Sequence, residues 1–164
     1  MESWSIEIDK EYLKFAAAHF LIFPDGTTER LHGHNYRVYC KIGGALSQYG
    51  LVLDFKKVKP LIRDLVDSLD EYWLIPGEHP ELKWEDRGDG VIEVRYRELY
   101  YAAPKSDVVV LPIRNVSAEK LAAWVGRGLL KRLGEEFPEV PLTFLWVAVE
   151  ETAGQRGCWT HSAD

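Results

Sequence analysis

The segment from Leu31 to Ile42 constrains the fold most, because its pattern predicts a long β-strand with histidines on one face. Side chains at positions i and i+2 of a strand point to the same side, so His32 and His34 project together. Their Cα atoms would lie about 6.6 Å apart, which allows both imidazoles to reach one ion. Two histidines at this spacing also occur by chance, so the pair alone does not establish a metal site.

A third histidine ends the apolar run that precedes this strand. Residues 4–20 alternate well enough for one or two strands ending at His19. His19 has the parity of Phe15 and Ala17, and the small alanines beside it leave room for a ligand. Three neutral imidazoles with one open coordination position form the ligand set of a catalytic zinc site rather than a structural one. His19, His32 and His34 are therefore candidate ligands for Zn²⁺, and the alternative is that these histidines share a face by chance.

Two helices are predicted after the histidine strand. Asp54 can cap a helix that runs through Leu69, because its carboxylate accepts from amides in the first turn that lack helical partners. Ser117 starts the second helix, and Gly134 is its expected stop. Each helix has one apolar face, so each should pack against a sheet.

The order of elements predicts an α+β fold in a single domain over residues 1–164. We expect an inserted β-hairpin at about 77–113 and a last strand from Leu142 to Glu151. The architecture is then an antiparallel sheet with both helices on one face. The other face and the sheet edges need cover, so we expect a homo-oligomer in which the sheets close into a β-barrel.

Composition narrows the function classes. The chain of 164 residues is 46% hydrophobic and 28% charged, which suits a globular domain with its own core. Its net charge of -6 argues against broad nucleic-acid binding. No stretch resembles a signal peptide or approaches the ~20 apolar residues of a membrane helix. Cys40 and Cys158 form no CxxC pair, which fits a reducing compartment, and Cys40 is expected to be a core thiol. We expect a cytoplasmic protein without a membrane or nucleic-acid partner.

Six short motifs follow one another along almost the whole chain: Phe15-Ala16-Ala17-Ala18-His19, Leu31-His32-Gly33-His34-Asn35-Tyr36, Leu53-Asp54-Phe55, Leu69-Asp70, Ser117-Ala118-Glu119 and Val149-Glu150-Glu151-Thr152. In this order they resemble the 6-pyruvoyl-tetrahydropterin synthase family, which includes the bacterial 6-carboxytetrahydropterin synthases. The resemblance implies the tunnelling fold (T-fold), a trimer or a dimer of trimers, active sites between subunits, and zinc on the three histidines.

The resemblance also implies that Glu151 anchors the pterin ring of a small-molecule substrate, with Thr152 beside it. A pterin presents an exocyclic amine and a ring N–H side by side, and one carboxylate can accept both hydrogen bonds. Without the family context, a solvated acid at the end of a strand is the favoured interpretation of Glu151, since exposed glutamate is the usual case.

The chain departs from the family pattern at the position of the usual catalytic cysteine. That position, four residues before His32, is Thr28, and Glu29 follows it. This arrangement resembles the type III subgroup, in which glutamate replaces the cysteine. The implied reaction removes the side chain of 7,8-dihydroneopterin triphosphate and gives 6-hydroxymethyl-7,8-dihydropterin. Glu29 would then move protons, provided that a dry site raises its pKa; otherwise it is a turn glutamate in solvent.

A second departure follows the first helix. Family members usually carry Asp-His there, whereas this chain has Asp70 and Glu71. Asp70 and Glu71 are therefore candidate catalytic residues, with His79 and His161 as other candidates for the missing histidine. Three functions remain open at this point: a zinc-dependent pterin lyase, a pyruvoyl- or carboxy-tetrahydropterin synthase with altered proton carriers, and a non-catalytic protein that binds pterin or metal.

Overall fold

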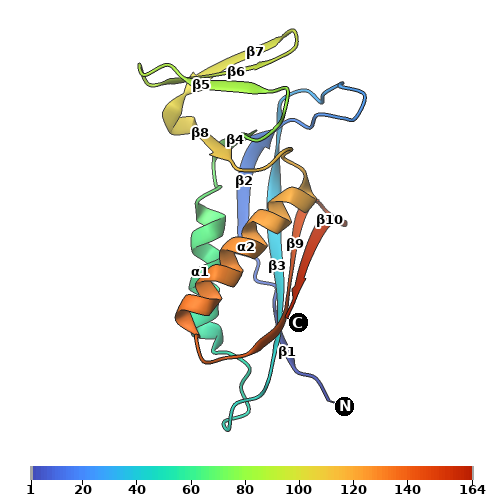
Figure 1. Ribbon diagram of the computed structural model, residues 1–164, viewed down its shortest axis with the longest axis vertical. Coiled ribbons are helices and arrows are strands. Elements are labelled where there is room, and N and C mark those ends of the chain that lie inside the picture. The colour runs from blue at the N-terminus through green and yellow to red at the C-terminus, as the bar shows by residue number, and fades with distance from the viewer. Residues whose placement is uncertain (1, 164) are drawn as a thin grey trace.

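The structure, a computed structural model, describes residues 2–163 of the chain. Its main sheet consists of β1 (Ser5–Ile8), β2 (Lys14–His19), β3 (His32–Gly44), β4 (Tyr72–Pro76), β8 (Val108–Leu111), β9 (Leu142–Thr152) and β10 (Gln155–Ser162). Within the described range these seven strands lie in the order β10-β9-β3-β2-β4-β8, with β1 paired to β3 (Figure 1). The end of β2 that carries His19 lies opposite the start of β3, which carries His32 and His34.

The two predicted helices are present, and both cover the same face of this sheet (Figure 1). Helix α1 (Phe55–Asp67) begins after Asp54, whose carboxylate accepts from the amide of Lys56 as expected. Helix α2 (Ala118–Glu136) begins after Ser117, and its end was predicted two residues too early. The chain stays helical through Gly134 because this glycine does not adopt a positive φ, and the amide of Phe137 still donates to the carbonyl of Leu133.

The pairing is mostly antiparallel, which confirms the expected α+β class with helices on one face. β3 is antiparallel to β2 and β9, whereas β4 runs parallel to both β2 and β8. Parallel neighbours need a crossover connection, and α1 supplies it on the path to β4. The sequence did not predict β4, β8 or β10, but β9 matches the expected last apolar strand closely.

The segment 77–113 is larger than the single hairpin that we expected, so that expectation was wrong in detail. It forms a separate three-stranded sheet from β5 (Lys83–Asp86), β6 (Val91–Tyr96) and β7 (Leu99–Pro104). A 3₁₀ turn, η1 (Lys105–Asp107), then leads into β8. The β5 strand was missed because its four residues are all exposed and mostly charged, so no alternation marks them.

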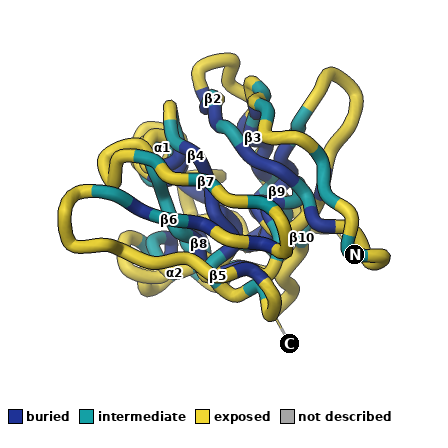
Figure 2. Tube along the Cα trace, turned by 90° about the horizontal axis from the view of Figure 1, so that it is seen from above, coloured by how far each residue is buried: buried dark blue, intermediate teal, exposed yellow. Residues whose placement is uncertain are grey.

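Two groups of buried side chains hold these parts together. The larger one lies between the main sheet and the helices, and the smaller one lies under the three-stranded sheet and includes Phe20, Trp73 and Val94. Figure 2 shows buried stretches along β2, β3, β4 and β9, with the connecting loops exposed. Cys40 is buried in the larger core, as predicted, and burial raises the pKa of its thiol to about 12. No helix among the described residues combines the length and apolar character needed to cross a membrane.

Candidate active site

The register between β2 and β3 brings the three predicted histidines together. His19 pairs directly with His32, and His34 lies opposite Ala17, two residues along. One nitrogen from each ring belongs to a group whose atoms all lie within 4.8 Å of one another. Nε2 of His32 lies 2.9 Å from Nε2 of His34. The predicted parity is therefore correct, and the antiparallel pairing supplies the third ring.

Backbone carbonyls orient two of these rings. Nδ1 of His19 lies 2.7 Å from the carbonyl oxygen of Val116, and Nδ1 of His32 lies 2.6 Å from that of Arg30. A carbonyl only accepts, so each Nδ1 carries the proton and each Nε2 keeps a free lone pair. A metal-binding histidine typically has this arrangement, in which the second nitrogen donates to a carbonyl or carboxylate.

The buried ring of His19 fits a metal ligand better than a structural histidine. Its side chain is fully buried, and its Nε2 has no hydrogen-bond partner among the described residues. Burial lowers the pKa of His19 below its ordinary value, although the Val116 carbonyl opposes that shift. The neutral form, which is the form that binds metal, is therefore favoured. Three such imidazoles are a donor set that suits zinc.

Glu151, at the end of β9, points toward the same rings. Its Oε1 lies 3.2 Å from Nε2 of His19 and 3.6 Å from Nε2 of His34. The ring of Tyr36 packs edge-on against those of His19 and His34. Its phenol is fully buried, and its pKa is raised by burial and by the charges of Glu151 and Glu29. The carboxylate that we predicted as the pterin anchor thus belongs to the histidine cluster rather than to the solvent.

Glu29 also reaches the cluster. It follows a tight loop in which Ile22 and Thr28 form an isolated antiparallel bridge. The amide of Leu21 donates to Glu29 Oε2 over 3.2 Å, and the same oxygen lies 3.8 Å from Nε2 of His32. The Glu29 side chain is 33% exposed, so it is half-buried rather than free in solvent.

The other predicted residues lie farther from the rings. Asp70 accepts a hydrogen bond of 2.8 Å from the amide of Ala16, which holds the end of α1 to β2. Glu71 adopts a positive φ of 64°, and its amide donates to the carbonyl of Ala16. Ala16 is three residues before His19, about 10 Å along the strand. Within one chain, Asp70 and Glu71 therefore do not join the three imidazoles.

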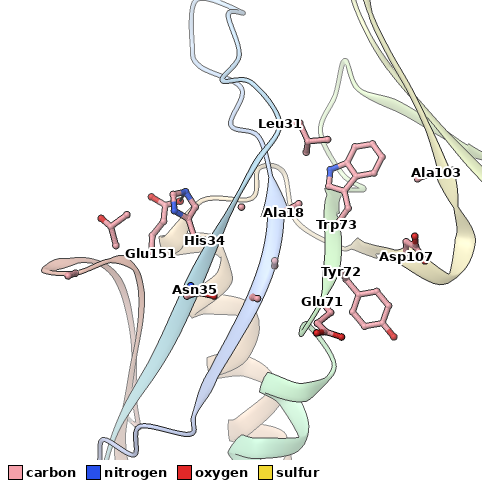
Figure 3. A pocket seen from close by; sticks show the side chains of 15 residues that line it. Ala18, Leu31, His34, Asn35, Glu71, Tyr72, Trp73, Ala103, Asp107 and Glu151 are labelled. Carbon is pink, nitrogen blue, oxygen red and sulfur yellow. Dashed lines mark ion pairs between the residues drawn. The ribbon is translucent and has the colours of Figure 1, made fainter.

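A cavity of about 860 Å³ is lined by His34 and Glu151 of the cluster and also by Glu71. In Figure 3, His34 and Glu151 lie on one side of β2, and Glu71, Tyr72 and Trp73 lie on the other. Thr152 also lines the cavity, while its hydroxyl donates to the side-chain oxygen of Gln155 in the β9–β10 turn. The cavity thus reaches from the histidine cluster to the Glu71 carboxylate.

Neither of the alternative histidines joins the site. His79 accepts from the amides of Glu81 and Leu82 through Nδ1, so it supports a turn instead. His161 stacks against Trp159 on β10. The sequence reasoning missed Val116, because it acts through a backbone carbonyl that no side-chain pattern reveals.

The fold and the cluster define a class of protein: a T-fold chain with a three-histidine group that could hold a metal ion. The sequence pattern of the 6-pyruvoyl tetrahydropterin synthase family matches residues 7–160 of this chain. The chain belongs to this family and is therefore an enzyme of pterin biosynthesis, in a family of lyases. The predicted resemblance is confirmed.

Curated relatives and solved structures agree with this assignment. A protein of Methanocaldococcus jannaschii, provisionally named 6-carboxy-5,6,7,8-tetrahydropterin synthase, is 30% identical over 148 residues, covering 90% of this chain and 89% of the relative. A Pyrococcus abyssi protein with the same provisional name is 31% identical over 128 residues, covering 77% and 76%. The 6-pyruvoyl tetrahydropterin synthase of Plasmodium vivax superposes with a TM-score of 0.92 at 24% identity, covering 99% of this chain and 100% of that one, which shows the fold.

Proposed function

We propose that this enzyme is a zinc-dependent pterin lyase that converts 7,8-dihydroneopterin triphosphate to 6-hydroxymethyl-7,8-dihydropterin. The observation that carries the proposal is the position of Glu29, whose carboxylate lies 3.8 Å from Nε2 of His32. The chain has two cysteines, and Cys40 is buried in the core while Cys158 lies on β10. Glu29 is thus the proton carrier that the site offers in place of a thiol.

The reaction is a retro-aldol cleavage between the first and second carbons of the substrate side chain. A base removes the proton of the second side-chain hydroxyl, and that carbon becomes an aldehyde as the carbon–carbon bond breaks. The electron pair moves into the conjugated imine of the pterin ring. An acid then returns a proton to the first carbon, which remains as the hydroxymethyl group. One carboxylate that first accepts and then donates a proton balances both steps.

The three imidazoles of His19, His32 and His34 would hold the zinc ion. A bound Zn²⁺ supplies Lewis acidity to hydroxyl oxygens, which makes their protons easier to remove. The carbonyls of Val116 and Arg30 keep two of these rings in the tautomer that the metal needs. Glu29, beside His32, is placed to exchange the proton at a hydroxyl held near the rings.

Glu151 is the proposed anchor for the pterin ring. Its carboxylate lies 3.2 Å from Nε2 of His19, and Glu151 lines the cavity, where a planar heterocycle could donate two parallel hydrogen bonds to it. Thr152 lines the same cavity and would contact the ring edge. Such an anchor fixes the side chain of the substrate toward the metal and Glu29.

We further propose that the enzyme is a homo-oligomer, a trimer or a dimer of trimers, with its sheets closed into a barrel. Asp70 and Glu71 would contribute to catalysis only if another copy brings them near the histidines of this one. Glu71 lines the cavity at the side remote from His34, which is consistent with such a shared site (Figure 3).

A second candidate is a 6-carboxytetrahydropterin synthase. It is favoured by the names of relatives such as the M. jannaschii protein. The lyase is favoured by Glu29 at the ring cluster. A variant of the P. vivax protein with a glutamate replaced by alanine is described as a catalytic residue mutant, so glutamate has that role in a protein of this fold.

The test is product identification with zinc-loaded protein and 7,8-dihydroneopterin triphosphate, followed by mass spectrometry. We expect 6-hydroxymethyl-7,8-dihydropterin, formed about 10²–10⁴-fold more slowly by Glu29→Gln. Glu135→Gln is the control, because Glu135 is exposed on α2 and pairs only loosely with Lys131. A carboxy product supports the synthase instead, and tight binding without turnover contradicts both.

A further inference from the structure

The loop that carries Glu29 is a compact unit. The amide of Glu29 donates to the carbonyl of Leu21, and the amide of Leu21 donates to the Glu29 carboxylate. Farther out, the amide of Phe23 donates to the carbonyl of Thr27. Leu21 and Glu29 thus move together, so the position of Glu29 depends on what holds the Leu21 side of the loop.

Asn115 holds that side with two hydrogen bonds to one residue. Its Oδ1 accepts from the amide of Ile22 over 3.2 Å, and its Nδ2 donates to the carbonyl of Ile22 over 2.9 Å. Both backbone groups of Ile22 are therefore satisfied by one carboxamide. A two-point contact fixes orientation as well as distance, which a single hydrogen bond does not.

Val116, the residue after Asn115, contacts the three-histidine cluster. Val116 accepts from Nδ1 of His19 over 2.7 Å, so neighbouring residues of one short connection contact both the ring cluster and the Glu29 loop. This connection lies between β8 and α2, and Ser117 begins α2 directly after it by accepting from the amide of Lys120. The start of a capped helix makes it a rigid reference point.

We infer that Asn115 is a positioning residue that sets the distance between Glu29 and the three histidines. This inference rests on the proposed role of Glu29 in catalysis. Asn115 does not touch the rings or the cavity, and it acts only through Ile22 and Leu21. Without its carboxamide, Ile22 keeps its apolar burial, but its backbone loses both partners and the loop can shift relative to His32.

A second contact on the same loop provides a matched control. The hydroxyl of Tyr96 donates to the carbonyl of Gly26 at the loop tip, over 2.9 Å. Removing it with Tyr96→Phe deletes one hydrogen bond from the tip, several residues from Glu29. If loop anchoring in general mattered, both variants would slow the reaction; if the Asn115 contact sets Glu29, only Asn115→Ala would.

The experiment is a double-mutant cycle of Asn115→Ala and Glu29→Gln, with zinc content measured for every variant. We expect Asn115→Ala to lower kcat about tenfold or more, since small misplacements of a reacting group cost up to about 10²-fold. Zinc content and KM should stay unchanged. In the Glu29→Gln background, Asn115→Ala should cost less than twofold, because the group that it positions has already gone.

Hydrogen exchange of the zinc-free protein gives a readout that is independent of activity. Asn115→Ala should speed exchange of the Leu21 amide, whose acceptor is the Glu29 carboxylate, and Tyr96→Phe should not. The inference is overturned if the kcat losses of the two single variants multiply in the double variant. It is equally overturned if Asn115→Ala loses zinc, or if exchange of the Leu21 amide is unchanged in that variant. Full activity of Glu29→Gln with altered Leu21 exchange would instead overturn the proposed function and leave Asn115 as the residue that holds the loop.

Discussion

Gly157 lies outside the three-histidine site, yet one methyl group added there should disturb that site. It lies in β10 directly against the start of α2. A Cβ atom there would lie 2.1 Å from the backbone nitrogen of Glu119 and 2.3 Å from the carbonyl carbon of Ala118. These are backbone atoms, so no flexible side chain can move aside. In Gly157→Ala the helix start must retreat by about 0.9 Å to reach even a tight contact of 3.0 Å.

The magnitude follows from two effects of this retreat. Overpacking of this kind costs about 1–3 kcal/mol, and 1 kcal/mol lowers Tm by about 2–4 °C in a chain of this size. Val116 comes just before α2, so its 2.7 Å contact with Nδ1 of His19 stretches by as much as the same shift, to about 3.6 Å. Loss of such a partner typically lowers metal affinity by about 10–100-fold.

Thermal denaturation and zinc titration measure both effects, and Gly134→Ala is the matched control. Apart from the neighbouring residues and backbone of its own helix, no atom of the described residues lies within 4 Å of a Cβ at Gly134, which is inside α2. Alanine there should raise stability by about 0.5–1 kcal/mol and leave zinc affinity unchanged. The reasoning is refuted if Gly157→Ala matches the native protein in Tm and zinc affinity, or if both glycine variants shift in the same direction.

Three further predictions concern ionisable groups of the site. Zinc-free protein should lose stability as the pH falls below about 6.5, by up to about 1.4 kcal/mol per pH unit. The reason is that burial lowers the pKa of His19 in the folded state, so the unfolded chain takes up the proton first. Urea unfolding at pH 7, 6 and 5 measures this change, and constant stability contradicts it. Glu71→Gly should raise stability by about 0.5–1 kcal/mol by relieving a positive φ, and unchanged turnover would remove Glu71 from the catalytic candidates. Glu151→Gln should keep zinc but bind a pterin about 10–100-fold more weakly by calorimetry; loss of zinc would make Glu151 a metal ligand instead.

The three-histidine cluster was predictable because its side chains follow local strand geometry. His32 and His34 share a face by the period of a strand, and His19 has the parity of its apolar neighbours. What the sequence could not supply was the register between the two strands. That register depends on a loop of twelve residues whose hydrogen bonds, such as Gly26 to Phe23, are set by turn geometry rather than by a side-chain period.

The inserted segment shows the opposite case, where local pattern was insufficient. The β6 strand has clear alternation, and the turn before it has two glycines with positive φ, Gly88 and Gly90, so a hairpin was predictable. Its partner β5 consists of exposed residues that gain a strand conformation only by pairing with β6. A short polar strand at a sheet edge is specified by its neighbour and not by its own sequence.

The same distinction explains which parts of the site can change without loss of the fold. The three histidines come from strands, whose positions depend on a large core. The groups that orient them, the carbonyls of Val116 and Arg30, come from the connections between these elements. Glu29 also lies on a connection and depends on Asn115 for its place. A chain that exchanged the proton carrier of this family could therefore keep its metal ligands, because a new carboxylate requires only a connection that holds it beside His32.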